Sequence, residues 1–283
     1  MAAARGRIDE TASIMADAPF SYRRATTFSE QFGLVVRVWV ALILRESKTR
    51  FGRNKLGFLW ALIEPLVFVG LFLLIRGGLR DRNIPFGQDL ALFLVTGLLA
   101  FRMFMSVASR GLGAIVSNLA LIAYPPVRPL DVIFARVGLE ILTMYVIWTI
   151  SLGLLSIFVE GKVIVDYVRF AAAMAALTYL SVSVATFNGV VAVLWPTWER
   201  LWGFLRLPLL ILTGILFLPT SMPLSVQAVM AWNPILHAVE WIRTAIYMTY
   251  DPVLSVPYLL GFSTVTLCIA LVLERGYRYK IYS

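Results

Sequence analysis

The sequence predicts an all-α polytopic membrane protein with six transmembrane helices, an interfacial helix before the first span and a re-entrant helical hairpin before the last. Hydrophobic residues make up 60% of the 283 residues and charged residues 14%, against about 25% charged in soluble proteins. Six apolar segments have close to the roughly 20 residues that cross a bilayer as a helix. They are residues 56–75, 90–107, 137–159, 170–195, 202–218 and 253–273.

The Lys and Arg residues are distributed unevenly over the segments between these spans. With both termini in the cytoplasm, 18 of them lie on the inside, counting Arg206 near the inner end of its span, and six on the outside, and the net charge is +9. Cytoplasmic segments of membrane proteins carry such an excess of Lys and Arg. The bias therefore predicts cytoplasmic N- and C-termini, and it explains the basic charge without a nucleic-acid partner.

The chain lacks the residues of an energy-using or catalytic centre. There is no phosphate-binding G-x-x-x-x-G-K-[ST] motif, and Cys268 and His237 are the single cysteine and histidine. We therefore expect no catalytic residues, no metal site and no cofactor in this chain. Residues 1–28 are polar and are expected to form a flexible cytoplasmic tail without a removable signal peptide. What remains is a channel, a gradient-driven carrier or a subunit driven by a partner.

The first non-spanning segment, residues 28–55, predicts a helix on the cytoplasmic membrane surface. Its apolar part, 32–44, would rise about 20 Å as a helix, too little to span a bilayer. Five cations follow it, and cations near anionic lipid stabilise surface binding. The helix is either a lipid anchor or a lever that transmits motion from a cytoplasmic partner.

The second segment, residues 109–136, lies between the second and third spans. A short helix is expected over 114–123, then an extended stretch with three prolines, and then a helix capped by Asp131. It is either a stiff turn or a docking surface for a soluble partner. The candidate residues for coupling to such a partner, here and on the surface helix, are Tyr124, Pro126, Arg128, Asp131, Arg45 and Glu46.

The third segment, residues 219–246, predicts two short helices broken at Asn233-Pro234. We expect them to dip into the outer leaflet and return; the alternative is a surface cap with interfacial Trp232 and Trp241. Glu240 and Arg243 are three residues apart and are expected to pair on one helix face. The candidate outer-gate residues are Trp232, Asn233, His237, Glu240 and Arg243.

Four ionisable residues fall within or at the ends of the apolar segments: Glu64, Arg102, Glu140 and Arg206. Such groups face a protein interior or a wet path, or reach the interface. We expect Arg102 to pair with Glu64 or Glu140. Aromatic residues and cations suit a path for sugars, although packing and loop solvation explain them equally well. The candidate lining residues are Trp60, Arg102, Phe101, Phe104, Tyr145, Trp148, Arg76, Arg80 and Arg82.

Three stretches carry a resemblance to a known family, the membrane subunits of ATP-binding-cassette exporters of bacterial surface polysaccharides. They are R-E-S-K-T-R-F-G-R-N-K-L-G-F-L-W-A-L-I-E-P from residue 45, Y-P-P-V-R-P-L-D-V-I-F-A-R from 124 and W-N-P-I-L-H-A-V-E-W-I-R from 232. The resemblance covers about residues 30–275. The first stretch is shared with the O-antigen branch, whereas the proline-rich second stretch is similar to the capsule branch.

The resemblance implies a single permease domain over residues 29–283 in the inner membrane of a Gram-negative bacterium. It implies a homodimer working with two copies of a cytoplasmic ABC ATPase, which would bind ATP and Mg. Residues 114–123 would be the coupling helix and the outer hairpin part of the exit gate. Periplasmic co-polymerase and outer-membrane export proteins would carry the polymer onward.

The function expected on this basis is ATP-driven export of lipid-linked capsular polysaccharide from cytoplasm to periplasm. An O-antigen exporter is the alternative within the class. A membrane glycosyl- or acyl-transferase is the alternative from another class, but its candidate residues Glu64, Glu140 and His237 are scattered over different spans. A passive channel is a further alternative.

Overall fold

A computed structural model describes residues 28–51, 90–122, 127–158, 163–247 and 250–277, together with the single residues 63, 67, 70, 71 and 74. The chain divides into two units, residues 1–37 and 38–283. The second unit holds the helix bundle and the C-terminal half of the first described helix. The predicted first span, 56–75, lies outside the described residues except for those five single positions, each of which is helical.

The described part of the chain is helical throughout, as predicted, and strands do not occur in it. Short 3₁₀ turns η1 and η2 separate some of the α-helices. The elements are α2 (Phe28–Phe51), α4 (Leu90–Leu112), η1 (Val116–Asn118), α5 (Leu119–Ile122), α6 (Pro129–Phe158), α7 (Tyr167–Leu194), α8 (Trp198–Leu212), η2 (Pro219–Ser221), α9 (Leu224–Met230), α10 (Pro234–Ile246) and α11 (Val256–Gly276).

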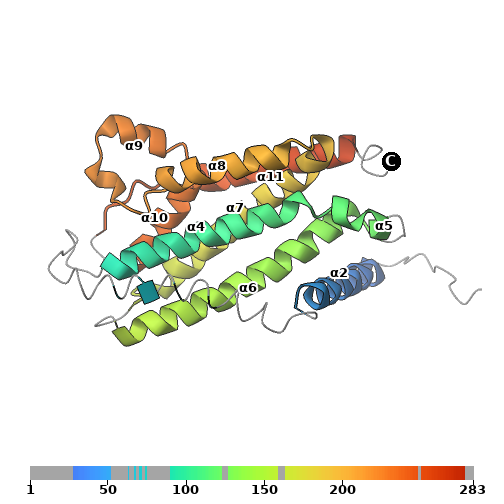
Figure 1. The fold of residues 1–283 in the computed structure, drawn as a ribbon, viewed down its shortest axis with the longest axis horizontal. Helices are drawn as coiled ribbons and strands as arrows, with labels where there is room; N and C mark the ends of the chain where they lie inside the picture. The colour runs from blue at the N-terminus through green and yellow to red at the C-terminus, as the bar shows by residue number, and fades with distance from the viewer. Residues whose placement is uncertain are drawn as a thin grey trace, which may run out of the picture. The chain divides into compact units, whose positions relative to one another are not determined.

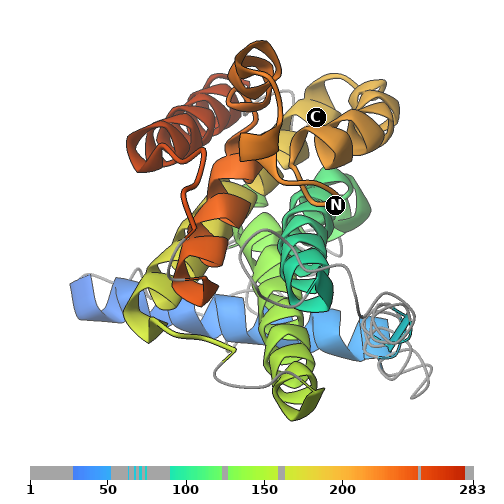
Figure 2. The same ribbon diagram turned by 90° about the vertical axis from the view of Figure 1, so that its left-hand side faces the viewer.

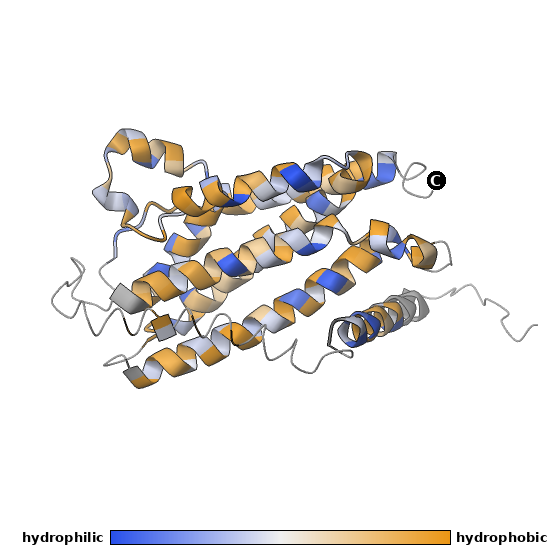
Figure 3. Cartoon of the chain, viewed as in Figure 1, coloured by the Kyte–Doolittle hydropathy of each residue, from blue (hydrophilic) through white to orange (hydrophobic). Residues whose placement is uncertain are grey.

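Four of these helices are long and apolar enough to cross a membrane. They correspond to the second, third, fourth and sixth predicted spans, namely α4, α6, α7 and α11. Figure 3 shows that apolar residues cover most of these helices and that polar residues occur singly. Many of the apolar side chains point outward from the bundle, for example Val265 and Val272 on α11. Such a surface suits lipid and not water.

The fifth predicted span, 202–218, is corrected by the structure. Helix α8 begins four residues earlier, at Trp198, and ends at Leu212, so its 15 residues rise only about 22 Å. Gly214 ends it with φ +64°, a left-handed conformation that a side chain disfavours. Hydropathy alone could not place this end, because residues 214–218 are as apolar as the helix.

Several helix starts follow from local capping. The Asp166 side chain accepts a hydrogen bond from the Arg169 N–H at the start of α7, and Ser255 does the same for Tyr258 at α11. Asn233 caps α10, with Pro234 at the first helical position, where its missing N–H is not needed. The predicted break at Asn233-Pro234 is thus a helix start.

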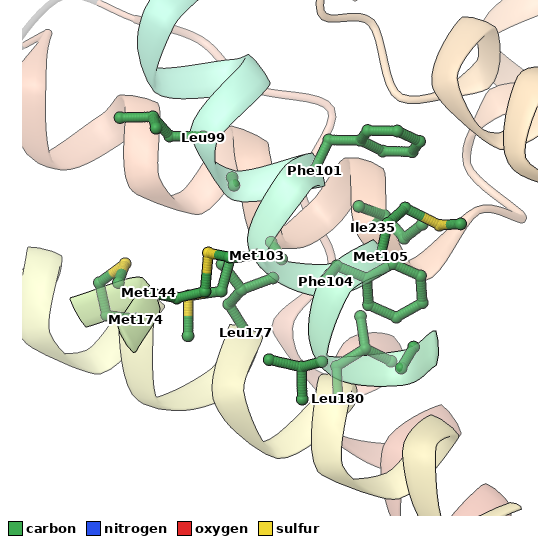
Figure 4. Close-up of a cluster of buried hydrophobic side chains, with 14 of the residues drawn as sticks. Leu99, Phe101, Met103, Phe104, Met105, Met144, Met174, Leu177, Leu180 and Ile235 are labelled. Carbon is green, nitrogen blue, oxygen red and sulfur yellow. The ribbon is translucent and has the colours of Figure 1, made fainter. Parts of the chain in front are cut away.

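Helix α7 is the centre of the bundle. It packs against α4, α6, α10 and α11, and these helices lie around it in the end-on view (Figure 2). Their shared core includes Met103 and Phe104 of α4 and Leu177 and Leu180 of α7, and Figure 4 shows Met103 beside Leu177. The loop with α5 lies at one end of the bundle, and α9 and α10 lie at the other (Figure 1).

Helices α4 and α7 cross with their backbones in close contact. A Cβ atom on Gly111 would lie 1.9 Å from the Ala185 carbonyl oxygen, and one on Gly189 would lie 2.9 Å from the Gly111 oxygen. Small residues at such crossings let membrane helices approach and gain dispersion contacts. The end of the α4–α7 pair nearest α5 therefore depends on these two glycines.

We expect Gly111→Ala to lower the free energy of unfolding by about 3 kcal/mol, the upper end of the range for overpacked cores, because the new methyl group must separate two backbones. Equilibrium unfolding in mixed micelles measures this change. Gly261→Ala on α11 is the control, since no atom lies within 4 Å of its added Cβ. Equal stability of the two variants would contradict the close crossing.

Candidate functional site

The C-terminal half of α2 is joined to the start of α6 through Trp39. The Trp39 indole Nε1 donates to Asp131 Oδ1 at 2.8 Å, and its ring lies 5.6 Å from that of Phe134. Asp131 also accepts the backbone N–H of Arg128 at Oδ2, 3.0 Å away. The predicted capping role of Asp131 is confirmed, and the same carboxylate fixes α2.

Two further contacts join α2 to this region. Glu46 Oε1 lies 2.8 Å from Arg136 Nε of α6, and both side chains are largely buried. Arg45 donates a hydrogen bond to the Asn118 side chain of η1, and Asn118 in turn donates to the Ala114 carbonyl. The C-terminal half of α2 is therefore fixed to both arms of the loop between α4 and α6. We call this set the inner junction: Trp39, Arg45, Glu46, Asn118, Asp131 and Arg136.

The short helical segment beside the inner junction has one buried and one exposed edge. Ile115 and Ile122 are buried, whereas Val116 is 55% exposed and Leu119 is 47% exposed. A short helix over 114–123 was predicted, and η1 with α5 confirms it over residues 116–122. Its exposed apolar edge lies at the end of the bundle opposite α9 and α10 (Figure 1).

The predicted coupling residues are only partly brought together. Arg45, Glu46 and Asp131 belong to the inner junction, and the Arg128 side chain is exposed beside it. Tyr124 and Pro126 lie outside the described residues. Sequence reasoning missed Trp39, Asn118 and Arg136. Trp39 could have been found from the sequence, because it lies seven residues before Glu46 and therefore on the same helix face.

At the other end of the bundle, Glu240 and Arg243 form an ion pair without exposure to solvent. Arg243 Nη1 lies 3.0 Å from Glu240 Oε1, and both side chains are completely buried. Their predicted pairing is confirmed. Arg243 Nη1 also donates to the Gly214 carbonyl at 3.0 Å, and its guanidinium lies 3.6 Å from the centre of the Phe93 ring. The pair thus ties α10 to α4 and to the end of α8.

Glu240 is satisfied by further donors from the loop between α10 and α11. The Tyr250 hydroxyl donates to both carboxylate oxygens, at 2.7 and 2.8 Å, and the Val253 N–H donates at 3.2 Å. Burial raises the pKa of Tyr250, and the Glu240 charge raises it further. The phenol therefore stays protonated and remains a donor. Nothing in the sequence singled out Tyr250.

The predicted outer-gate residues divide into a buried set and an exposed one. Asn233 donates from Nδ2 to Thr213 Oγ1 at 3.0 Å. His237 accepts the Ser255 N–H at Nδ1, 3.1 Å away, so its Nε2 donates to the Ala231 carbonyl at 2.9 Å. Trp232, by contrast, is 78% exposed. Four of the five residues hold α10 in place, and the fifth is at the surface.

The predicted lining residues are also divided. Phe101, Phe104 and Trp148 are buried in the core, while Tyr145 is partly exposed and its hydroxyl lies 3.0 Å from Thr178 Oγ1. Trp60, Arg76, Arg80 and Arg82 lie outside the described residues. Arg102 is partly buried, and its pairing with Glu64 or Glu140 stays a prediction, as does the lining role of the whole set.

Glu140 is buried between α4 and α6, although a position at the membrane interface was an alternative. It accepts hydrogen bonds from the Ser106 hydroxyl and from Arg110 Nε, the latter at 2.8 Å.

Within the described residues, no group of three or more His, Cys, Asp or Glu side chains is arranged to hold a metal ion.

Comparison with known proteins gives a consistent set of relatives. A family model described as "ABC-2 type transporter" matches residues 37–247. The polysialic acid transport protein KpsM of Escherichia coli is 34% identical over 83% of this chain and 91% of its own length. The capsule polysaccharide export inner-membrane protein BexB of Haemophilus influenzae is 27% identical over 90% of this chain and 97% of its own. CtrC of Neisseria meningitidis serogroup B, described in the same words as BexB, is 28% identical over 80% and 86%.

We expect Arg243→Leu to lower the free energy of unfolding by about 3–5 kcal/mol, because it leaves the Glu240 carboxylate buried without its cation. Arg169→Leu is the control: Arg169 is about half exposed and lies 3.5 Å from the partly exposed Asp166. That change should cost at most about 1 kcal/mol. Unfolding of both variants in the same detergent measures the difference, and similar losses would contradict the buried pair.

Proposed function

The chain belongs to the ABC-2 type transporter family, and on that premise we propose that it is the membrane subunit of an ATP-driven exporter of capsular polysaccharide. The observation that carries the proposal is the similarity over most of both lengths to proteins named for polysialic acid transport and capsule export. Those names favour capsule over the O-antigen alternative. The family also makes the chain a transport subunit and not an enzyme.

In this proposal the energy comes from a cytoplasmic ABC ATPase that binds ATP and Mg. The exposed edge of Val116 and Leu119 would seat on that ATPase. Movement of this edge would pass to α2 and α6 together, because the inner junction links them by the contacts of Trp39, Arg45 and Glu46. The inner junction supports a lever role for α2 in addition to lipid anchoring.

We further propose six spans, with residues 56–75 as the first and α8 with the turn after it as the fifth. Both termini would then be cytoplasmic, as the distribution of cations requires. The exposed apolar side chains of α9, including Leu224 and Val229, support insertion of the outer hairpin into the outer leaflet. Because α10 is held by buried polar contacts, the part of the hairpin free to act as a gate is α9 with Trp232.

The transported molecule in this proposal is a lipid-linked capsular polymer that moves from the cytoplasm to the periplasm of a Gram-negative bacterium. A second copy of the chain would complete the path. The proposed first span, residues 56–75, and α8 are not among the four helices long enough to cross a membrane in the structure. These two spans would border the path. Periplasmic and outer-membrane export proteins would receive the polymer.

Removal of the chain from its host should abolish surface capsule and leave polymer inside the cell. The purified complex should contain the ABC ATPase and hydrolyse ATP. These results are measured by capsule immunoblotting and by copurification with an ATPase assay. Persistence of capsule, or purification without an ATPase, would refute the function, and loss of O-antigen with capsule retained would select the alternative.

The lever is tested by exchanging the charges of the Glu46–Arg136 pair. Glu46→Arg alone places two cations side by side and Arg136→Glu two carboxylates, so each is expected to reduce surface capsule at unchanged membrane insertion. The double exchange restores the pair and should recover most of the export. If the single variants export normally, or if the double variant fails like the single ones, the inner junction does not transmit force.

A further inference from the structure

The start of α8 is attached to the bundle by two indole groups. Trp198 Nε1 donates to Asn188 Oδ1 of α7, and Trp202 Nε1 donates to Ser109 Oγ of α4, each at 3.0 Å. The two tryptophans are four residues apart and therefore lie on one face of the helix. Trp202 is only 7% exposed, and a buried indole N–H normally has a partner. These two hydrogen bonds therefore fix the position at which α8 begins.

Both hydrogen bonds lead to the last turns of α4. Asn188 is completely buried, and its Nδ2 donates to the Ala108 carbonyl of α4 at 3.1 Å. One amide thus joins Trp198 to α4 as well as to α7. Ser109, the acceptor for the second indole, is the next residue of α4. The close crossing at Gly111 joins the two backbones at the same level, so both indoles are bound to one body.

The end of α4 continues into the segment with the exposed apolar edge, η1 and α5. Helix α4 ends at Leu112. The Ala114 N–H then donates to the Gly111 carbonyl at 3.0 Å, and the Ser117 N–H donates to the Gly113 carbonyl at 3.1 Å. Helical hydrogen bonds therefore extend from α4 into η1. A movement of η1 and α5 displaces the end of α4, and with it the partners of both indoles.

The other end of α8 has a fixed point of its own. Asn233 and Arg243 donate hydrogen bonds to the turn after Leu212. Between the two ends, every residue from 203 to 208 is exposed. Pro208 also lacks the N–H that would complete the backbone hydrogen bonds of the helix near this end. Helices bend most readily at such a proline. Displacement of the start of α8 therefore tilts the helix about its other end.

We propose that Trp198 and Trp202 are positioning residues for transport, which make the start of α8 follow the end of α4. This inference rests on the proposed function, in which an ATPase moves η1 and α5 and in which α8 borders the path. The resulting tilt of α8 changes the width of the path at the end where α8 begins. Two indole donors suit this task because a hydrogen bond has a defined length and direction.

The first experiment removes both donors and keeps the aromatic rings. In Trp198→Phe with Trp202→Phe, each lost bond lowers the equilibrium constant for the attached position of α8 about fivefold. Surface capsule is therefore expected to fall about 25-fold, while the complex still copurifies with its ATPase and hydrolyses ATP. Trp195→Phe is the matched control, because Trp195 is 49% exposed and its indole donates no hydrogen bond within the described residues. Wild-type export by the double variant, or an equal loss in the control, would overturn the proposal.

The second experiment tests one of the two bonds from both sides. Ser109→Ala removes the acceptor and Trp202→Phe removes the donor, so each variant alone should reduce surface capsule about fivefold. The combined variant should reduce it no further, because the bond is already lost. Export is compared at equal amounts of folded complex, which thermal unfolding of each purified variant measures. A loss of about 25-fold in the combined variant would show that the two side chains act independently and would overturn the role of this bond.

The third experiment measures the movement of α8 itself, which a purely structural role of the indoles would leave unchanged. Gly203→Cys on α8 and Gly261→Cys on α11 provide sites for spin labels, because no atom lies within 4 Å of a Cβ added at either glycine. Cys268→Ser removes the native cysteine. The distance between the labels is measured by electron spin resonance in the complex with its ATPase, with and without ATP. We expect ATP to change this distance in the wild type and not in Trp198→Phe with Trp202→Phe.

Two results of the label experiment would overturn the proposal: no change with ATP in the wild type, or the same change in the variant without the indoles. Failure of the proposed function has a different signature. In that case capsule persists after removal of the chain, or the chain purifies without an ATPase. The two failures are therefore distinguishable.

Discussion

The end of the structure that carries α10 depends on the satisfaction of one buried carboxylate. Glu240 has no access to solvent, and a charge in that position is tolerated only with a paired cation and further donors. Arg243, Tyr250 and the Val253 N–H supply them. Tyr250 and Val253 belong to the loop before α11, and Arg243 of α10 also donates to the Gly214 carbonyl after α8. One charge therefore determines where α10, the end of α8 and this loop lie.

The end that carries α5 is organised by a different principle. Gly111 and Gly189 bring the α4 and α7 backbones together, and polar side chains of α2 then bind the loop that follows α4. Close backbone packing gives rigidity at the start of the loop, and one ion pair with two hydrogen bonds holds the C-terminal half of α2. The two ends of the bundle therefore differ: the end at α10 is joined through buried charge, and the end at α5 through steric fit, one partly buried ion pair and hydrogen bonds.

Much of the architecture followed from sequence because hydropathy and capping are local properties. The spans at α4, α6, α7 and α11, the helix start at Asn233 and the Glu240–Arg243 pair were all predicted. The predicted end of α8 was wrong, because the left-handed conformation of Gly214 leaves no signal in the hydropathy of the sequence. The contacts of Trp39 and Tyr250 join residues far apart in the chain or in an irregular loop, and single-sequence periodicity holds no information on such pairs.

The spacing of Glu240 and Arg243 has a consequence for biogenesis. Because the two residues lie on successive turns of one helix, their charges meet as soon as that helix forms, before the loop after α10 has been made. Helix α10 then enters the membrane with the charges of Glu240 and Arg243 already paired. The other carboxylate oxygen is bonded by Tyr250 and Val253, which are made after α10 and before α11, so Glu240 has all its donors only once synthesis has passed Val253.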